Sequence, residues 1–215
     1  MTTKQRYDGV IAWFSEHMPV AESELHYSDP YQLLVAVILS AQCTDKRVNM
    51  TTPALFEAFP TPYHMARATA EEIYPYIRSI SYPNNKARNL AGMARMLCEE
   101  FGGEVPSDLE QMQRLPGVGR KSANLIMGDV FGKPAIVTDT HCIRLCNRIG
   151  LVDNVKEPAK VERELWKIIP PAEGNGFCHR LVDHGRAVCT ARTKPYCDKC
   201  CLADVCRARK EFLHE

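Results

Sequence analysis

The sequence lacks any long apolar run, and its first residues lack the pattern of a secretion signal. The longest apolar stretch, Leu33–Leu39, is far shorter than the ~20 residues that a membrane-spanning helix needs. Residues 1–9 are polar, with no hydrophobic segment behind a basic start, so we expect no signal peptide. These absences predict a cytoplasmic protein without a membrane segment.

Signs of β-structure are also missing. No stretch of alternating β-branched residues stands between hairpin turns, and there are no repeats, low-complexity linkers or heptads. Apolar residues instead recur at helical spacing, most clearly over 84–103, where Asn84 or Asn85 is expected to cap the start. Ser107-x-x-Glu110 is a capping-box pattern that predicts a short helix ending at Pro116. Further helices are expected over 31–41, 45–58, 120–130, 140–148, 158–168, 176–189 and 202–213. The predicted fold class is all-α.

The chain has almost no net charge, but its charges are unevenly distributed. The formal total is +1 over 215 residues. Residues 1–75 carry five lysines and arginines against nine acidic residues, whereas residues 114–148 carry six against two. Residues 178–215 carry eight against five. A basic middle and C-terminus could form one face that binds phosphates, or could simply be solvated surface.

Ten cysteines are many for a chain without a secretion signal, so thiols or metal ligands are expected rather than disulfides. Cys189-x7-Cys197-x2-Cys200-x5-Cys206 supplies the ligand set of either a [4Fe–4S] cluster or a structural zinc ion. The spacing alone leaves both open, and Cys201 offers an alternative ligand beside Cys200. We expect the remaining cysteines to be core or half-buried thiols.

The segment Leu115–Asn124 predicts a tight hairpin between two helices, with two glycines that can take positive φ. Amides at the start of the second helix would bind a phosphate without reading base sequence. A nucleotide P-loop needs adjacent Gly and Lys, and Arg120 intervenes here. An ordinary helix connection is the alternative. The candidate DNA contacts of this turn are Leu115, Gly117, Val118 and Gly119.

Lys121 and Asp139 are the candidate catalytic residues. A free lysine has a pKa of about 10.4, so about one in 2,500 is neutral at pH 7. A helix N-terminus, neighbouring Arg120 and partial burial would lower this pKa and favour a Schiff-base nucleophile. A phosphate-binding surface lysine is the alternative. Asp139 can stabilise an oxocarbenium-like centre, or can simply cap the helix that follows.

With these motifs the chain resembles the endonuclease III family of helix-hairpin-helix DNA glycosylases, along essentially its whole length. The resemblance is carried by Leu39–Asp45, Leu115–Asn124, Val137–His141, His184–Arg186 and the final cysteines. It implies two helical lobes flanking a DNA-binding cleft. One would be a six-helix barrel lobe at 22–133, with the helix-hairpin-helix at about 107–130. The other would be a discontinuous iron–sulfur lobe of 1–21 plus 134–215.

The resemblance also implies roles for individual residues. Lys121 would be the nucleophile and Asp139 its catalytic partner, on double-stranded DNA that contains damaged pyrimidines or abasic sites. Gln42 and Tyr82 would fill the gap left by a flipped-out base, and His141 would contact DNA. Tyr82 departs from the leucine usual in this family, and a buried core tyrosine is the alternative.

The final cysteines would hold a [4Fe–4S] cluster in this family. The ligands implied are Cys189, Cys197, Cys200 and Cys206. The family usually has six residues in the first gap, and this chain has seven, so the path of that loop is open.

The predicted function is that of a bifunctional DNA glycosylase and AP lyase in base excision repair, acting as a monomer. The lysine would attack C1′ of an oxidised pyrimidine nucleotide, and β-elimination would cleave the strand on the 3′ side. A monofunctional glycosylase of the same superfamily is the first alternative, but the related adenine glycosylases lack a lysine at position 121. A non-catalytic DNA-binding iron–sulfur module is the second, and it has no need for Lys121 and Asp139 together.

Overall fold

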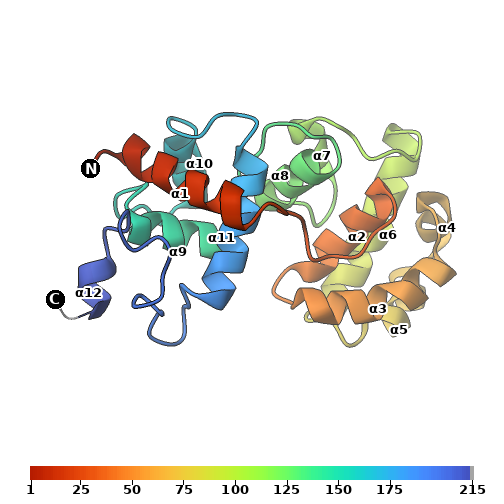
Figure 1. The fold of residues 1–215 in the computed structure, drawn as a ribbon. Helices are drawn as coiled ribbons and strands as arrows, with labels where there is room; N and C mark the ends of the chain where they lie inside the picture. Colours follow the sequence, from red (N-terminus) through yellow and green to blue (C-terminus); the bar gives the residue numbers. More distant parts are fainter. Residues whose placement is uncertain (214–215) are drawn as a thin grey trace. The chain divides into compact units, whose positions relative to one another are not determined.

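The computed structural model describes residues 1–213, and within them the chain forms twelve helices and no strand (Figure 1). The helices are α1 Thr3–His17, α2 Pro30–Ser40, α3 Asp45–Ala58, α4 Pro62–Arg67, α5 Ala70–Ile77, α6 Pro83–Glu100, α7 Leu109–Arg114, α8 Arg120–Asp129, α9 Thr140–Ile149, α10 Pro158–Leu165, α11 Gly174–Ala187 and α12 Arg209–Leu213. The all-α prediction is confirmed. No helix among the described residues is long and apolar enough to cross a membrane.

The chain divides into two compact units. The central unit is Ser23–Gly132, and the terminal unit combines Met1–Glu22 with Lys133–Glu215. The sequence-based expectation placed the corresponding boundaries at 22–133 and at 1–21 plus 134–215, of which residues 214–215 lie outside the described part. The central unit therefore holds α2 to α8, and both ends of the chain contribute helices to the terminal unit.

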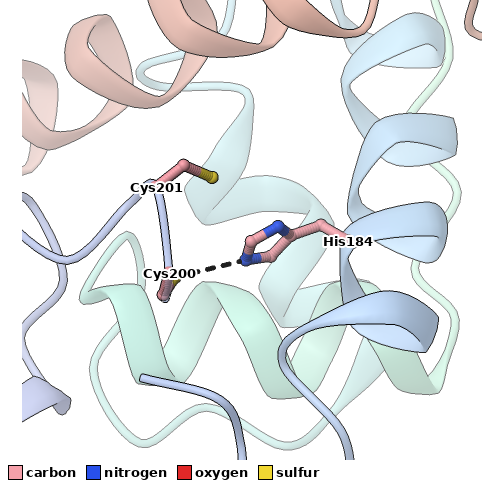
Figure 2. Close-up of side chains that lie close together, drawn as sticks. All are labelled: His184, Cys200 and Cys201. Carbon is pink, nitrogen blue, oxygen red and sulfur yellow. Dashed lines mark hydrogen bonds between the residues drawn. The ribbon is translucent and has the colours of Figure 1, made fainter. Parts of the chain in front are cut away.

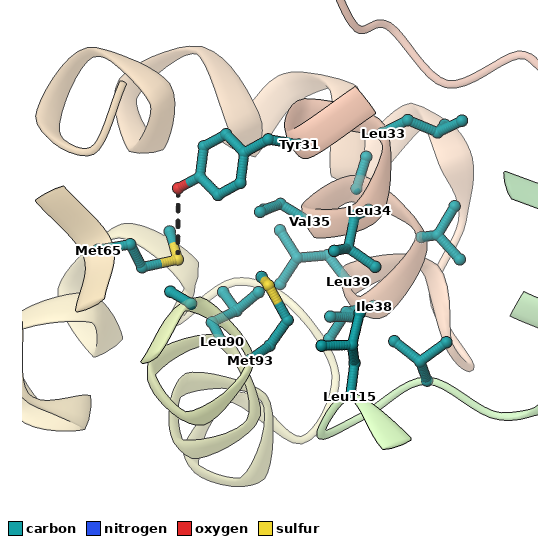
Figure 3. Close-up of a cluster of buried hydrophobic side chains, with 14 of the residues drawn as sticks. Tyr31, Leu33, Leu34, Val35, Ile38, Leu39, Met65, Leu90, Met93 and Leu115 are labelled. Carbon is teal, nitrogen blue, oxygen red and sulfur yellow. Dashed lines mark hydrogen bonds between the residues drawn. The ribbon is translucent and has the colours of Figure 1, made fainter. Parts of the chain in front are cut away.

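Helix α2 is the centre of the central unit's core. Eight of its eleven residues are buried, so it is apolar on all sides, as expected for a helix enclosed by others. It packs against α3, α6 and α8. In Figure 3, Ile38 and Leu39 of α2 lie together with Leu90 and Met93 of α6 and with Leu115. Each such side chain contributes roughly 1.5–3 kcal/mol when it is fully buried.

Most helices begin at a threonine or aspartate whose side chain accepts a backbone N–H, which satisfies amides that the helix leaves unpaired. The capping residues are Thr2, Asp29, Thr44, Thr61, Thr69, Asp108 and Asp139. The Ser107-x-x-Glu110 capping box is therefore wrong. Asp108 caps α7 instead, accepting from the amides of Glu110 and Gln111 at 3.1 and 2.9 Å. The Asn84 or Asn85 cap of α6 is also wrong, because α6 begins one residue earlier.

Three regions differ from the helices expected from the sequence, and one of them is α1, which was not expected from the helical pattern. Another lies near the C-terminus. Residues 202–208 form turns, and only Arg209–Leu213 is helical. The amides of Arg207 and Ala208 donate to carbonyls of α9, at Ile149 and Arg148, and this pairing replaces a helix there. The third region holds α4 and α5, which the apolar spacing did not predict because each is too short to show a period.

The terminal unit has an aromatic core built from both ends of the chain. Tyr7 and Phe14 of α1 are buried against Phe177 of α11, and the Tyr7 and Phe177 rings meet edge to face at 5.5 Å. The Tyr7 hydroxyl donates a hydrogen bond to the Glu173 carboxylate. Burial, together with this hydrogen bond, raises the pKa of Tyr7 well above its usual range.

Candidate functional site

The hairpin between α7 and α8 lies as the sequence predicts, at Leu115–Gly119. Leu115 and Val118 are buried, which anchors the turn in the central unit's core. Gly117 has φ of +83°, and an added Cβ would lie 3.1 Å from Asn89 and 3.2 Å from Ile38. Gly119 differs from the expectation of positive φ. It has φ of −89°, because it is the extended N-cap residue of α8.

Gly119 leaves the start of α8 uncovered. It has no side chain to cap the helix, and no atom lies within 4 Å of the place that its Cβ would take. Amides at a helix start have no carbonyl of the same helix to bond, and the helix dipole is positive there. The open backbone at this turn therefore suits an anion such as a phosphate.

Lys121 is the second residue of α8 and is exposed. The partial burial expected for it is therefore wrong. Its place in the first turn puts the side chain beside the same positive helix end that suits a phosphate. An exposed amine at this point is accessible to a ligand whose anionic group lies at the turn.

Gln42 and Tyr82 form an exposed pair in the central unit. Both have left-handed backbones, with φ of 53° and 55°, a conformation that costs a non-glycine residue about 1–2 kcal/mol. The Ser81 hydroxyl donates to the Gln42 carbonyl at 2.7 Å and so joins the two loops. Tyr82 is 62% exposed, so the alternative of a buried core tyrosine is wrong.

Asp139 lies in the terminal unit and caps α9. Its Oδ1 accepts from the Cys142 amide at 2.7 Å, so the capping interpretation is confirmed. His141 follows in the first turn of α9 and packs so closely on α11 that a Cβ at Gly185 would approach its Nδ1 to 2.4 Å. Behind this turn Cys178 accepts from the Val137 amide at 3.2 Å. The site residues Lys121 and Asp139 thus belong to different units.

The four cysteines predicted as ligands line one pocket of the terminal unit. Cys189, Cys197, Cys200 and Cys206 all line this pocket, with Leu145, Ile149 and Tyr196 among the other lining residues. Arg148 donates to Cys189 Sγ at 3.2 Å. Cys201 is not among the residues that line the pocket.

A second grouping overlaps with this pocket. Cys200 Sγ lies 3.6 Å from His184 Nε2, and the ligand atoms of His184, Cys200 and Cys201 all lie within 4.8 Å of one another (Figure 2). The hydrogen bond with Cys201, together with burial, raises the pKa of the Cys200 thiol to about 12. Burial also raises the pKa of Cys197 and of Cys206. A thiol-rich arrangement of this kind suits a metal cofactor, whose binding displaces the thiol protons.

Sequence reasoning did not find one residue at the exposed pair. Lys86 is 5% exposed, and its Nζ donates to the carbonyls of Leu39 and Ala41 and to the Ser81 hydroxyl, at 2.8, 2.6 and 3.3 Å. Nothing in the local sequence indicates this burial, since lysine is almost never fully buried.

Comparison with known proteins identifies the family. Residues 35–171 match the HhH-GPD superfamily of base excision DNA repair proteins. Endonuclease III of Synechocystis sp. is 46% identical over 94% of this chain and 92% of its own length, and that of Escherichia coli K12 is 40% identical over 94% and 95%. A trapped covalent intermediate of endonuclease III with DNA, an estranged-adenine complex, superposes with a TM-score of 0.93 at 41% identity, covering 99% of this chain and 100% of the other. The chain therefore belongs to the HhH-GPD superfamily and, within it, to the endonuclease III family.

Proposed function

We propose that this chain removes oxidised pyrimidines from double-stranded DNA and cleaves the strand at the resulting abasic site, with Lys121 as the nucleophile. The observation that carries the proposal is the exposed Lys121 in the first turn of α8, directly after the uncapped hairpin. The covalent endonuclease III–DNA intermediate among the relatives supports it, since an amine nucleophile forms such an adduct.

The reaction begins when the hairpin binds the phosphate backbone and the damaged nucleotide leaves the stack. Flipping costs a few kcal/mol and is least unfavourable for a damaged, poorly stacked base. The neutral Lys121 amine then attacks C1′, so that an N–C1′ bond forms while the bond between C1′ and the base breaks. The base leaves with a proton. Opening of the sugar ring gives an imine between Lys121 and C1′.

The imine makes the second step possible. It acidifies the C2′ proton, and removal of this proton breaks the C3′–O bond, which releases the 3′ portion of the strand with its 5′ phosphate. Hydrolysis of the imine then returns the lysine. Asp139 supplies the carboxylate that stabilises positive charge at C1′ and assists proton transfer, while it also caps α9.

Gln42 and Tyr82 fill the space that the flipped base vacates. Tyr82 replaces lost stacking with a flat aromatic ring, and its 62% exposure leaves that ring accessible to DNA. We place His141, Gly117 and Gly119 among the DNA contacts as well, whereas the buried side chains of Leu115 and Val118 anchor the turn that presents them. The protein acts as a monomer, which sedimentation of the purified chain tests directly.

The four cysteines that line the terminal-unit pocket fit a [4Fe–4S] cluster, because a cluster of this kind is held by four thiolates and all four cysteines line the same pocket. Cys189, Cys197, Cys200 and Cys206 would hold it. When bound, it would supply iron–sulfur bonds that join Cys189, just after α11, to the later loops that carry Cys197, Cys200 and Cys206. We assign Cys200 rather than Cys201 as the third ligand, because only Cys200 lines the pocket.

The ligand assignment is tested with two neighbouring variants. Cys200→Ser is expected to lose visible cluster absorbance and bound iron, whereas Cys201→Ser keeps both. The reverse result would make Cys201 the ligand. Retention of zinc in place of iron by the parent protein would contradict the cluster itself.

The activity is tested by borohydride trapping on duplex DNA that contains one thymine glycol or one abasic site. The parent is expected to form a covalent adduct with both substrates, and Lys121→Ala with neither. Lys160→Ala, which removes another exposed lysine, is the matched control and traps as the parent does. If the parent released the damaged base without an adduct, the protein would be a monofunctional glycosylase. DNA binding without base release or cleavage would leave only a binding module.

A further inference from the structure

Lys86 is a buried ammonium group whose hydrogen-bonding capacity is fully used. An ammonium has three N–H donors, and Nζ of Lys86 meets three acceptors. Two are carbonyls at the C-terminal end of α2, where helix carbonyls lack partners and the helix dipole is negative. The third is the hydroxyl of Ser81. Burial disfavours the charged ammonium and so lowers the pKa of Lys86. The three acceptors act in the opposite direction, because they stabilise the ammonium form.

Two of the three acceptors belong to residues that directly precede the left-handed residues of the exposed pair. Ala41 directly precedes Gln42, and Ser81 directly precedes Tyr82. The Ser81 hydroxyl accepts from Lys86 and donates to the Gln42 carbonyl, so one chain of hydrogen bonds connects the two loops. Lys86 itself lies four residues after Tyr82, in the first turn of α6, and its amide donates to the Tyr82 carbonyl at 3.1 Å.

This connection has a specific consequence for an exposed pair. A left-handed backbone is unfavourable for glutamine and for tyrosine, so it persists only where surrounding contacts hold it. Loops that are ordered before binding lose less conformational entropy when they bind. Without Lys86, the ends of both loops would lose their common anchor.

We propose that Lys86 is a positioning residue that holds Gln42 and Tyr82 in the conformation in which they enter duplex DNA. The inference rests on the proposed glycosylase and lyase function. Its action is indirect, because Lys86 is buried and acts through Ser81 and the Ala41 carbonyl. We therefore expect Lys86 to affect the cleavage of duplex DNA, in which a base stack must be opened and filled, and not the cleavage of an abasic site in single-stranded DNA.

The test compares two substrates under single-turnover conditions. One is a duplex with a single abasic site, and the other is the same strand without its complement. Lys86→Met keeps the length of the side chain but removes the three donors. It is expected to cleave the duplex at least about tenfold more slowly and the single strand within about twofold of the parent, since only in the duplex must the abasic sugar be turned out of a stacked helix and the gap opposite the remaining base be filled. Lys160→Met is expected to match the parent on both.

A spectroscopic measurement follows the insertion itself. With 2-aminopurine opposite the abasic site, insertion by the parent unstacks the probe and raises its fluorescence, and Lys86→Met is expected to reduce this rise. Ser81→Ala removes only the hydroxyl bridge and is expected to show a smaller defect of the same kind. If the urea unfolding midpoint shows that Lys86→Met does not fold, Ser81→Ala tests the positioning role in its place.

The outcomes separate the two proposals. Equal slowing on duplex and single strand, or no slowing on the duplex, would overturn the positioning role of Lys86. Absence of an adduct with the parent on either substrate would instead refute the lyase function on which the inference rests.

Discussion

Gly117 and Gly119 stand two residues apart in the hairpin, but the structure predicts opposite results for their substitution. Gly117→Ala places a Cβ on a residue at φ of +83°, which costs about 1–2 kcal/mol. The new Cβ also lies 3.1 Å from Asn89 and 3.2 Å from Ile38, and such crowding adds roughly 1 kcal/mol. Loss of unfolded-state entropy offsets about 0.5 kcal/mol, so the net destabilisation is about 2 kcal/mol.

Gly119→Ser meets none of these obstacles. Its backbone is extended at φ of −89°, and no atom lies within 4 Å of the new Cβ. Serine is a preferred N-cap residue, so stability should change by less than about 0.5 kcal/mol, toward greater stability. The new hydroxyl would bond an amide of the first turn of α8. That amide is then lost to a phosphate, and DNA affinity is expected to fall about tenfold.

Both expectations are measured on the same pair of proteins. For a chain of this size 2 kcal/mol corresponds to a fall in Tm of about 4–8 °C for Gly117→Ala. Calorimetry gives this shift, and fluorescence anisotropy with an undamaged duplex gives the affinity of Gly119→Ser. Equal losses of stability in the two variants would refute the conformational argument. Unchanged affinity of a stable Gly119→Ser would refute phosphate binding at the hairpin.

Three further predictions concern the two units. Asp139→Asn should keep the cap of α9, because asparagine caps as well as aspartate, but it should slow base release at least about a hundredfold. Asp139→Ala should slow base release in the same way and also lose about 1 kcal/mol of stability. Matching thermal stabilities for the two variants would contradict the cap. Tyr7→Phe removes the hydrogen bond to Glu173 and should cost about 1–3 kcal/mol at neutral pH. Because the pKa of Tyr7 is raised in the folded state, its stabilising effect is full below about pH 10 and declines above it, so urea midpoints of Tyr7→Phe and the parent should converge at alkaline pH; a constant difference would argue against this. Leu34→Ala opens a cavity in the central core and should cost about 2–5 kcal/mol in urea unfolding, and a loss below about 1 kcal/mol would show that the site collapses.

Much of the fold could be predicted from local patterns in the sequence. Helix α3 has the bounds expected from the sequence, Asp45–Ala58, and the hairpin lies between α7 and α8 as expected. The errors occur where distant contacts decide the local structure. The start of α6 is fixed by the left-handed Tyr82 rather than by an asparagine cap, and residues 202–208 pair with α9 instead of forming a helix.

The candidate site likewise contains residues that local sequence indicated and one that only distant contacts reveal. Chemistry and spacing singled out Lys121, Asp139 and the four cysteines, since each stands in a motif with a chemical reason. Lys86 has no such motif. Its partners Leu39 and Ala41 are more than forty positions earlier in the chain, and a lysine in the first turn of a helix is ordinarily a surface residue. Only the three-dimensional pairing of the two loops reveals it.

The discontinuity of the terminal unit sets an order for folding during synthesis. Residues 23–132 can complete their core as soon as they have left the ribosome, since domains generally fold as units and N-terminal parts emerge first. Helix α1 emerges from the ribosome first but cannot complete its contacts until the C-terminal residues are synthesised. The reason is that Arg6 donates to the carbonyl of Val205 and Gly9 packs against the same valine. Helix α1 and the cysteine loops therefore assemble last, after the central unit has folded. A fusion tag at either terminus would be attached to this same unit, which is the last to fold.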